Sequence, residues 1–293
     1  MNLKDIRKEA RYLLKGSWLK LSLIVFIFNL FILFVYAAPN ILNFSSTVLI
    51  LAVAVIGLIS TIFVIPFIYG LFSVIIKSIN GEKVRLLEFV STGIKNFKKS
   101  YFLIFGIVIS LAVPILAFII SAVFLDYGIR HFLTFIITTG GIIYTIATFF
   151  MFAKAFYYIP SFFVMIDNEE KSVKDILNES KEIMTLERVN LLKLFGIFAL
   201  FFIIMLGISF GAGIIFHSQD AYAIVATIGY MILFPYFIVS LYVFYKYKKD
   251  PHYKFIYEEH VKEQENKKES KKENKDKVEN KSKKSEKKNK KNK

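Results

Sequence analysis

The sequence contains no cysteine, which excludes disulfide bonds, thiolate metal sites and cysteine nucleophiles in one step. It also has no Asp, Glu, Lys or Arg from position 21 to position 76. A charge-free stretch of roughly 18 residues already suggests one membrane-spanning helix. This stretch is far longer, so it must hold more than one span, and a soluble globular domain is excluded.

Signatures of catalysis are missing as well. The chain has no phosphate-binding glycine loop, no H-E-x-x-H and no pair of carboxylates within its apolar runs, the usual marks of an ATPase, a metalloprotease or a proton-coupled pump. "GISFG", residues 207–211, matches the G-x-S-x-G pattern of serine hydrolases, but a nucleophile elbow needs a strand before the serine. Ser209 instead lies in an apolar helical run. We therefore expect no enzyme, no metal site and no bound cofactor.

Apolar residues are abundant instead. The 293 residues are 55% hydrophobic and include 32 Phe, whereas apolar residues make up about 45–50% of a soluble domain. Six runs are long enough to cross roughly 30 Å of hydrocarbon; they lie near 18–38, 47–76, 101–124, 132–165, 190–216 and 221–245. The sequence predicts an all-α, polytopic integral membrane protein with six spans, and the number of spans is predicted to within one.

Two of these runs are longer than a bilayer requires. As straight helices, 47–76 and 132–165 would each measure about 45 Å or more. Each contains a proline near its far end, Pro66 and Pro160, and a proline inside a helix removes a hydrogen bond and forces a bend. We therefore expect each run to be a span followed by an elbow near the membrane interface.

Charge in the connecting segments predicts the orientation. Lys and Arg concentrate in three segments, with six, six and five in residues 1–20, 77–99 and 167–193. The loops that alternate with these segments hold only Arg130; they are 39–46, 125–131 and 217–220. Cytoplasmic loops carry the excess of Lys and Arg, so both termini should be cytoplasmic.

Three parts follow along the chain: an amphipathic cytoplasmic helix over 1–17, the transmembrane domain over 18–249, and a low-complexity tail over 250–293. Residues 246–293 hold 19 Lys and 10 acids, and a segment with so few apolar residues cannot bury a core. We expect a disordered basic tail. Two roles remain open for it: attraction to anionic lipid, or non-specifically to RNA, and a merely solvated tail.

The chain also resembles itself weakly. "TIFVIPFIYGLFSVIIKSINGEK" (61–83) is echoed by "TFFMFAKAFYYIPSFFVMIDNEEK" (148–171), and in each copy a mixed segment and an apolar run beginning "FGI" follow. Both copies run in the same direction, as in the parallel repeats of some transporters. Chance similarity between two runs of Phe and Ile is the alternative.

Three cytoplasmic segments have apolar residues at helical spacing. The expected stripes are Leu3, Ile6, Ala10, Leu13 and Leu14; then Leu86, Val90, Ile94 and Phe97; then Val173, Ile176, Leu177, Ser180, Ile183 and Met184. Each stripe could lie on the anionic inner leaflet or pack against the helices beneath it, and the sequence leaves both open.

Few residues suggest a binding site. Lys154 is the only Lys or Arg well inside an apolar run. Its side chain either snorkels to the cytoplasmic boundary or contacts a lipid headgroup or substrate. The acids Asp167, Glu169 and Glu170 then form the first solvated turn after the membrane.

We expect the side-chain amide of Asn29 to form a hydrogen bond between helices. Small residues at Gly207, Gly211 and Gly213 have the spacing that lets two membrane helices pack closely.

Three stretches resemble a known family: "IRKEARYLLKGSW", "IPSFFVMIDNEEKSVKDILNESKEIM" and "FPYFIVSLYVFY". Over roughly residues 1–247 the chain is similar to the bacterial membrane family called domain of unknown function 975. The middle stretch is shared with related families, including the membrane domain attached to some glycerophosphodiester phosphodiesterases; after "SKEIM" the pattern tends to continue with glycine, where this chain has Thr185. The resemblance implies a polytopic inner-membrane protein and lends no activity or catalytic residues.

Two functions follow from these features. The first is a non-enzymatic scaffold or accessory module that binds lipid, a protein partner or a second copy of itself. The alternative is a transporter or permease for a small solute or lipid, favoured by the repeat, the prolines and Lys154. A transported polar solute needs polar residues along its route, and the spans offer few.

The absence of cysteine makes the predicted orientation directly testable. A single cysteine placed at Gln219, in the loop after the fifth span, should react with a membrane-impermeant maleimide added to whole cells, because that loop should face outward. A single cysteine at Lys174 should react only after the cells are opened. Labelling in the reverse pattern would contradict the orientation.

Overall fold

A computed structural model describes residues 3–41, 47–250, 253 and 256, and the regular elements within these residues are helices, with no strand among them. In chain order they are α1 (Leu3–Leu13), α2 (Trp18–Ile41), α3 (Thr47–Ile79), α4 (Glu88–Lys95), α5 (Phe97–Ser110), α6 (Ala112–Arg130), α7 (Thr134–Ala155), the 3₁₀ turn η1 (Phe156–Tyr158), α8 (Ser161–Asp167), α9 (Val173–Met184), α10 (Arg188–Ile215) and α11 (Gln219–Lys249). The all-α prediction is confirmed. The tail from 257 onward lies outside the described residues.

Five helical stretches are long and apolar enough to cross a membrane. They are Ile62–Ile79, Ala112–Arg130, Thr134–Asp167, Arg188–Ile215 and Gln219–Lys249. A sixth candidate is the pair formed by α1 and Trp18–Leu33, which meet at a bend of 90°. The chain is therefore a polytopic membrane protein with five or six spans.

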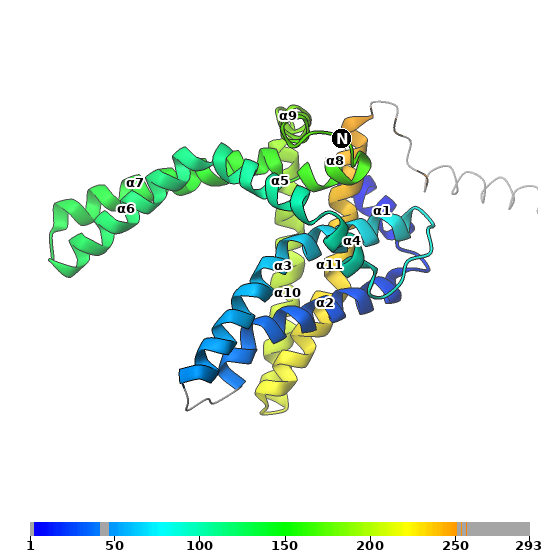
Figure 1. Ribbon diagram of the computed structural model, residues 1–293, viewed down its shortest axis with the longest axis horizontal. Coiled ribbons are helices and arrows are strands. Elements are labelled where there is room, and N and C mark those ends of the chain that lie inside the picture. The colour runs from blue at the N-terminus through cyan, green and yellow to red at the C-terminus, as the bar shows by residue number, and fades with distance from the viewer. Residues whose placement is uncertain (1–2, 42–46, 251–252, 254–255, 257–293) are drawn as a thin grey trace, which may run out of the picture.

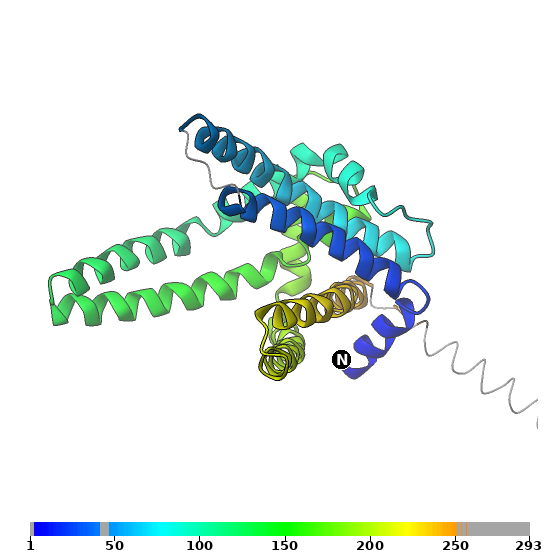
Figure 2. The same cartoon turned by 90° about the horizontal axis from the view of Figure 1, so that it is seen from below.

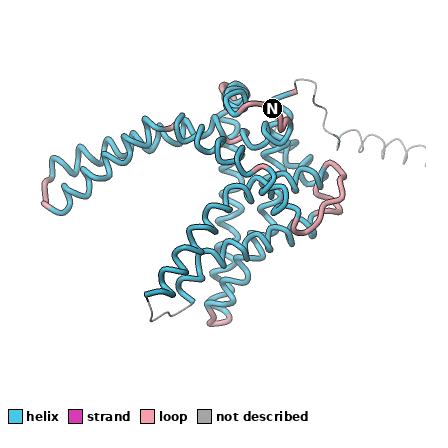
Figure 3. Tube along the Cα trace, in the orientation of Figure 1, coloured by secondary structure: helices cyan, strands magenta, loops and turns pink. Residues whose placement is uncertain are grey.

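The helices form two arms that meet at one end of the molecule, as Figures 1 and 2 show. One arm is a bundle of α2, α3, α10 and α11. The other is a hairpin of α6 and α7 that points away from the bundle. Where the arms meet, the C-terminal end of α11 lies among α1, α4, α8 and α9, and we call this end of the molecule the base. Figure 3 shows the same arrangement coloured by secondary structure, with loops joining the helices.

The protein core lies at the base. Buried side chains occupy the first turns of α2, the second half of α3, the start of α10 and α11 from Pro235 to Tyr245. Away from the base, most large apolar side chains of α6, α7 and α10 are exposed. Hydrocarbon is as apolar as these side chains, so helices inside a membrane gain little from burying them. Water at the membrane surface makes the same burial favourable.

The two predicted elbows have different outcomes. Helix α3 continues through Pro66 as one helix, so no break separates a span from an elbow there, and a bend within the helix at Pro66 stays a prediction. Proline lacks an N–H and leaves the carbonyl four residues earlier, that of Ile62, without its helical partner; the Tyr101 hydroxyl of α5 donates to that carbonyl. Near Pro160 the helix does break, because α7 ends at Ala155 and the turn η1 precedes α8.

The third predicted span, 101–124, is also corrected. Its first half belongs to α5, which ends at Ser110, and the apolar stretch that can span begins at Ala112. Pro114 explains the break, because it cannot donate to the Ser110 carbonyl four residues earlier. The break lets α5 run along the base while α6 leaves it in a new direction.

The amphipathic segments pack inward at two of three places. On α1, Ile6, Ala10 and Leu14 are fully buried against the rest of the base, and on α9 Ile176 and Met184 are likewise buried. On α4 the predicted stripe does not pack inward as a whole, and its contact with the leaflet stays a prediction. Ile94 is 53% exposed, whereas Phe89 is 1% exposed and makes up the buried face together with Thr92 and Gly93.

Glycines explain why α4 turns that face inward. A Cβ added at Gly70 of α3 would lie 1.9 Å from the carbonyl oxygen of Phe89, and one at Gly93 would lie 2.6 Å from that of Pro66. The two backbones therefore touch, which only glycine permits. Lys77 pairs with Glu88 at 3.2 Å beside this contact.

The proposed internal repeat has a counterpart in the order of elements. A span, a short helix at the base and a return occur in α3–α4–α5 and again in α7–α9–α10, with α8 added in the second unit. In both units the short helix packs back on the preceding span or its extension. The repeat stays a prediction, because similar order does not establish similar shape.

Glycine-to-alanine substitutions should separate packing glycines from free ones. We expect Gly70→Ala and Gly93→Ala each to destabilise the protein by about 1–3 kcal/mol, because the new methyl meets backbone atoms that cannot move aside. Gly207→Ala, whose methyl would meet nothing within 4 Å, should be neutral or stabilising by up to about 1 kcal/mol through helix propensity.

Thermal unfolding in one detergent measures these differences. Equal melting temperatures for Gly93→Ala and Gly207→Ala would contradict the close contact between α3 and α4.

Candidate functional site

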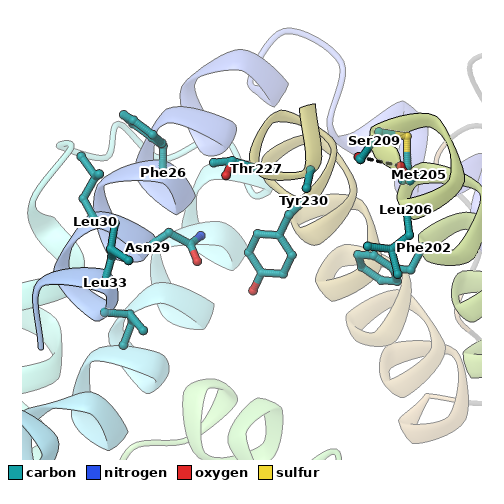
Figure 4. A pocket seen from close by; sticks show the side chains of 12 residues that line it. Phe26, Asn29, Leu30, Leu33, Phe202, Met205, Leu206, Ser209, Thr227 and Tyr230 are labelled. Atoms are coloured by element: carbon teal, nitrogen blue, oxygen red, sulfur yellow. Dashed lines mark hydrogen bonds between the residues drawn. The ribbon is translucent and has the colours of Figure 1, made fainter. Parts of the chain in front are cut away.

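A cavity of about 570 Å³ opens between α2, α10 and α11. Its lining residues are Phe26, Asn29, Leu30, Ile32 and Leu33 from α2; Phe202, Met205, Leu206 and Ser209 from α10; and Ala226, Thr227 and Tyr230 from α11. Figure 4 shows these side chains converging on one space from three helices. The cavity lies further from the base than the packed core, as the order of residues along each helix requires.

Contacts between α2 and α11 close the cavity toward the base. The Trp18 indole N–H donates to the Ile232 carbonyl at 3.0 Å, and its ring lies 5.8 Å from that of Tyr236. Ile232 lies one turn before Pro235, and the carbonyl that Pro235 leaves without its helical partner is the neighbouring one, that of Met231. The Phe198 ring packs on Tyr236 at 5.0 Å.

Beside the cavity, α10 and α11 lie close together at Gly229. A Cβ there would lie 2.1 Å from Cε of Met205, so the glycine makes room for the methionine side chain. Sequence reasoning missed Gly229 as a packing residue. Within the part of the chain that the structure describes, no comparable close contact joins α2 to α10 at this level, and the cavity fills the space between them.

The polar groups of the cavity are few and uncharged. The Asn29 amide donates to the Val25 carbonyl of its own helix at 2.8 Å, so the hydrogen bond expected between helices is not the one formed, and its Oδ1 stays available. Ser209 and Thr227 donate to carbonyls one turn earlier, both at 2.8 Å. Among the described residues, none hydrogen-bonds to the Tyr230 hydroxyl. The cavity can therefore offer hydrogen bonds at Asn29 and Tyr230 to an uncharged ligand.

The predicted packing glycines do not form a seam within this chain. A Cβ at Gly207 or Gly211 would meet nothing within 4 Å, whereas one at Gly213 would lie 3.2 Å from Cβ of Tyr222 in the neighbouring helix α11. Gly213 packs on α11 as expected, whereas no described residue of this chain packs on Gly207 or Gly211, so helix packing at these two glycines stays a prediction. Spacing shows that small residues share a face, but it does not show what that face meets.

Lys154 is exposed near the end of α7 and lines a second, smaller groove between α6 and α7. It forms no ion pair with any carboxylate that the structure describes. Pro160 caps the start of α8, and the carbonyl of Tyr157 in the preceding turn accepts a hydrogen bond of 2.7 Å from Ser180 of α9. Lys154 and Pro160 therefore lie at the base, where the hairpin joins it.

Asp167 joins α8 to the end of α11. Its carboxylate accepts hydrogen bonds from the Tyr245 hydroxyl at 2.9 Å, from Lys246 at 3.1 Å and from Lys249 at 2.9 Å. Its side chain is only 11% exposed, so the interpretation as part of a solvated turn is wrong for Asp167, while Glu169 and Glu170 are exposed. The spacing of Tyr245 and Lys249 on one helix face was the available signal.

A second carboxylate holds the same end of α11. Glu187, just before α10, pairs with Lys248 and accepts a hydrogen bond of 2.8 Å from Asn190. Burial opposes ionisation of Glu187, but the bonds from Asn190 and Lys248 outweigh it and hold the pKa of the carboxyl below its usual value. Both acids are thus ionised at neutral pH and neutralise lysines of α11.

Removing the charge of Asp167 should loosen the base. We expect Asp167→Asn to destabilise the protein by about 1–3 kcal/mol, because hydrogen bonds to a charged group are lost and two lysines are left without their carboxylate. Glu170→Gln, at an exposed neighbour, is the matched control and should change the melting temperature little. An Asp167→Asn protein as stable as the control would show that the cluster does not hold α8 to α11.

Comparison with known proteins adds a family but no activity. No curated protein and no solved structure matches the chain. The relation to glycerophosphodiester phosphodiesterases that the middle stretch suggests therefore stays a prediction. Residues 1–250, which include every helix described above, match the family described as "Protein of unknown function (DUF975)", and the chain belongs to that family.

Proposed function

We propose that this protein is a non-enzymatic membrane module that binds the uncharged part of a membrane lipid in the cavity between α2, α10 and α11. It acts in a bacterial cytoplasmic membrane with both termini inside the cell, as a scaffold or accessory subunit for a protein partner or a second copy. The observation that carries the proposal is an apolar cavity with two available hydrogen-bonding groups among the spans of a membrane protein.

Size and chemistry support a lipid as the ligand. The cavity falls within the roughly 300–1,000 Å³ typical of small-molecule sites, which are mostly apolar and use few polar groups to orient the ligand. An acyl chain matches the Phe, Leu and Ile of the lining. A hydroxyl or ester oxygen of the lipid could then bond to Asn29 and Tyr230.

The lining also supports binding rather than chemistry or ion transport. None of the 12 lining residues is Asp, Glu, His, Lys or Arg, which leaves Tyr230 without a charged partner for proton transfer and favours binding over hydrolysis. A charged solute within the membrane would lack a counter-charge there, which is costly. The preferred ligand therefore keeps any charged headgroup outside the cavity.

A permease is the second candidate. Four spanning stretches contain a proline, namely Pro66, Pro114, Pro160 and Pro235, and the stretch that holds Pro160 is broken just before it. Broken helices line the sites of many transporters. Transport would require the contacts at Trp18 and Tyr236 to open toward the base. Movement of a labelled lipid across proteoliposomes that contain the protein, and not across empty ones, would favour the permease.

Two tryptophan substitutions on α10 test the lipid site. Leu206 and Ile204 are isomeric side chains of similar exposure, 51% and 57%, and only Leu206 lines the cavity. Leu206→Trp should fill the cavity and reduce co-purified lipid by about tenfold or more, since it removes contacts worth at least about 1.4 kcal/mol. Ile204→Trp should leave lipid binding unchanged.

Native mass spectrometry of the gently extracted full-length protein measures the bound lipid. Tyr230→Phe and Asn29→Leu should each weaken retention of the same lipid without emptying the cavity. A wild-type protein with no retained lipid, or equal retention by Leu206→Trp and Ile204→Trp, would overturn the proposal.

A further inference from the structure

The hairpin carries a groove of its own at the end nearest the base. It has a volume of about 210 Å³ and is lined by Val113, Pro114 and Ala117 of α6 and by Ile143, Ile146, Ala147, Phe150 and Lys154 of α7. Every lining residue except Lys154 is apolar. Lys154 is the last of them along α7, so the one charge lies at the base end of the groove.

The shape of the groove follows from how the hairpin is packed. Near the hairpin tip, glycine brings the helices together: a Cβ at Gly140 would lie 3.3 Å from the backbone nitrogen of Leu125. At the other end, α6 starts anew at Ala112 after the break before Pro114, while α7 continues to Ala155. The groove is the trough between them, with Ala117 and Ala147 as its small side chains.

Positive charge at the base end is not neutralised by the protein. Lys154 forms no ion pair with a carboxylate that the structure describes, and Arg188 stacks on the ring of Tyr157, one helical turn after Lys154, at 4.5 Å. The acids of the neighbouring segments, Asp167 and Glu187, are bound to lysines of α11. Lys154 and Arg188 are exposed and pair with no carboxylate that the structure describes, so an anion from outside the protein can bind to them.

We propose that the groove binds an acyl chain of an anionic phospholipid and that Lys154 and Arg188 hold the phosphate of its headgroup. The groove supplies the apolar surface, and the two cations lie where the chain gives way to the headgroup. A zwitterionic lipid fits less well, because its ammonium group would meet these cations, while the neighbouring acids Asp167 and Glu187 are already bound to lysines of α11. The site lies on the hairpin, apart from the central cavity, and does not depend on that cavity's binding a lipid.

A competition between two lipids tests the site. The full-length protein is equilibrated in mixed micelles with equal amounts of phosphatidylglycerol and phosphatidylcholine of identical acyl chains, and bound lipids are counted by native mass spectrometry. Wild type should prefer phosphatidylglycerol. Lys154→Met should reduce that preference about fivefold, the factor that corresponds to one cation near an anionic lipid, and Lys154→Arg should retain it.

Three further variants separate this site from general effects. Lys20 is another exposed lysine near the start of a helix, and its own side chain lines neither the cavity nor the groove described above. Lys20→Met should therefore leave the preference for phosphatidylglycerol unchanged. Ala117→Phe keeps Lys154 but fills the groove, so it should reduce retention of both lipids at this site. Leu206→Trp, in the central cavity, should not alter the preference for phosphatidylglycerol.

The outcomes are distinct. Equal effects of Lys154→Met and Lys20→Met would show attraction to the surface as a whole and overturn the site. No preference in wild type would also overturn it. Should Lys154→Met fail to yield a monodisperse protein, Lys154→Gln and Ala117→Phe carry the test, and unchanged lipid counts in both would refute the proposal.

Discussion

Hydrogen bonds from a side chain of one element to a backbone carbonyl of another are the interactions on which much of this fold depends. In hydrocarbon no water can bond to a free carbonyl, so a donor must come from the protein. Tyr101 of α5 donates to Ile62, whose carbonyl Pro66 leaves without its helical partner. Trp18 of α2 donates to Ile232 and Ser180 of α9 donates to Tyr157, each three residues before a proline. Each donor comes from another element, so each bond ties two segments together.

These ties, the glycine contact between α3 and α4 and the salt bridges of Asp167 all lie at or next to the base. In the bundle, α2 parts from α10 and α11 beyond the base and leaves the central cavity. In the hairpin, the groove beside Lys154 lies at the base end, where α6 starts anew, and the helices meet closely nearer the tip. Both spaces are apolar because they are lined by side chains selected for contact with hydrocarbon. Their few polar groups then decide what kind of lipid atom each can accept.

Sequence reasoning succeeded where one physical quantity dominates. The length of an apolar run against bilayer thickness gives the spans, and helical spacing gives the inward faces of α1 and α9. Sequence reasoning failed to predict contacts between two helices, because both surfaces of such a contact have to be known at once. Phe89 rather than Ile94 is buried on α4 because Gly70 and Gly93 permit backbone contact. Gly207 and Gly211 have packing spacing but no packing partner in this chain.

The sequence by itself determined that the chain is helical and spans a membrane. The free energy of transferring each apolar side chain to hydrocarbon is a local quantity, and these contributions add up along the chain. Only the tertiary structure decided where the charges and cavities are. Asp167 is nearly buried because Tyr245, Lys246 and Lys249, far away in the sequence, reach it. A cavity belongs to no single segment, since it exists only where helices part.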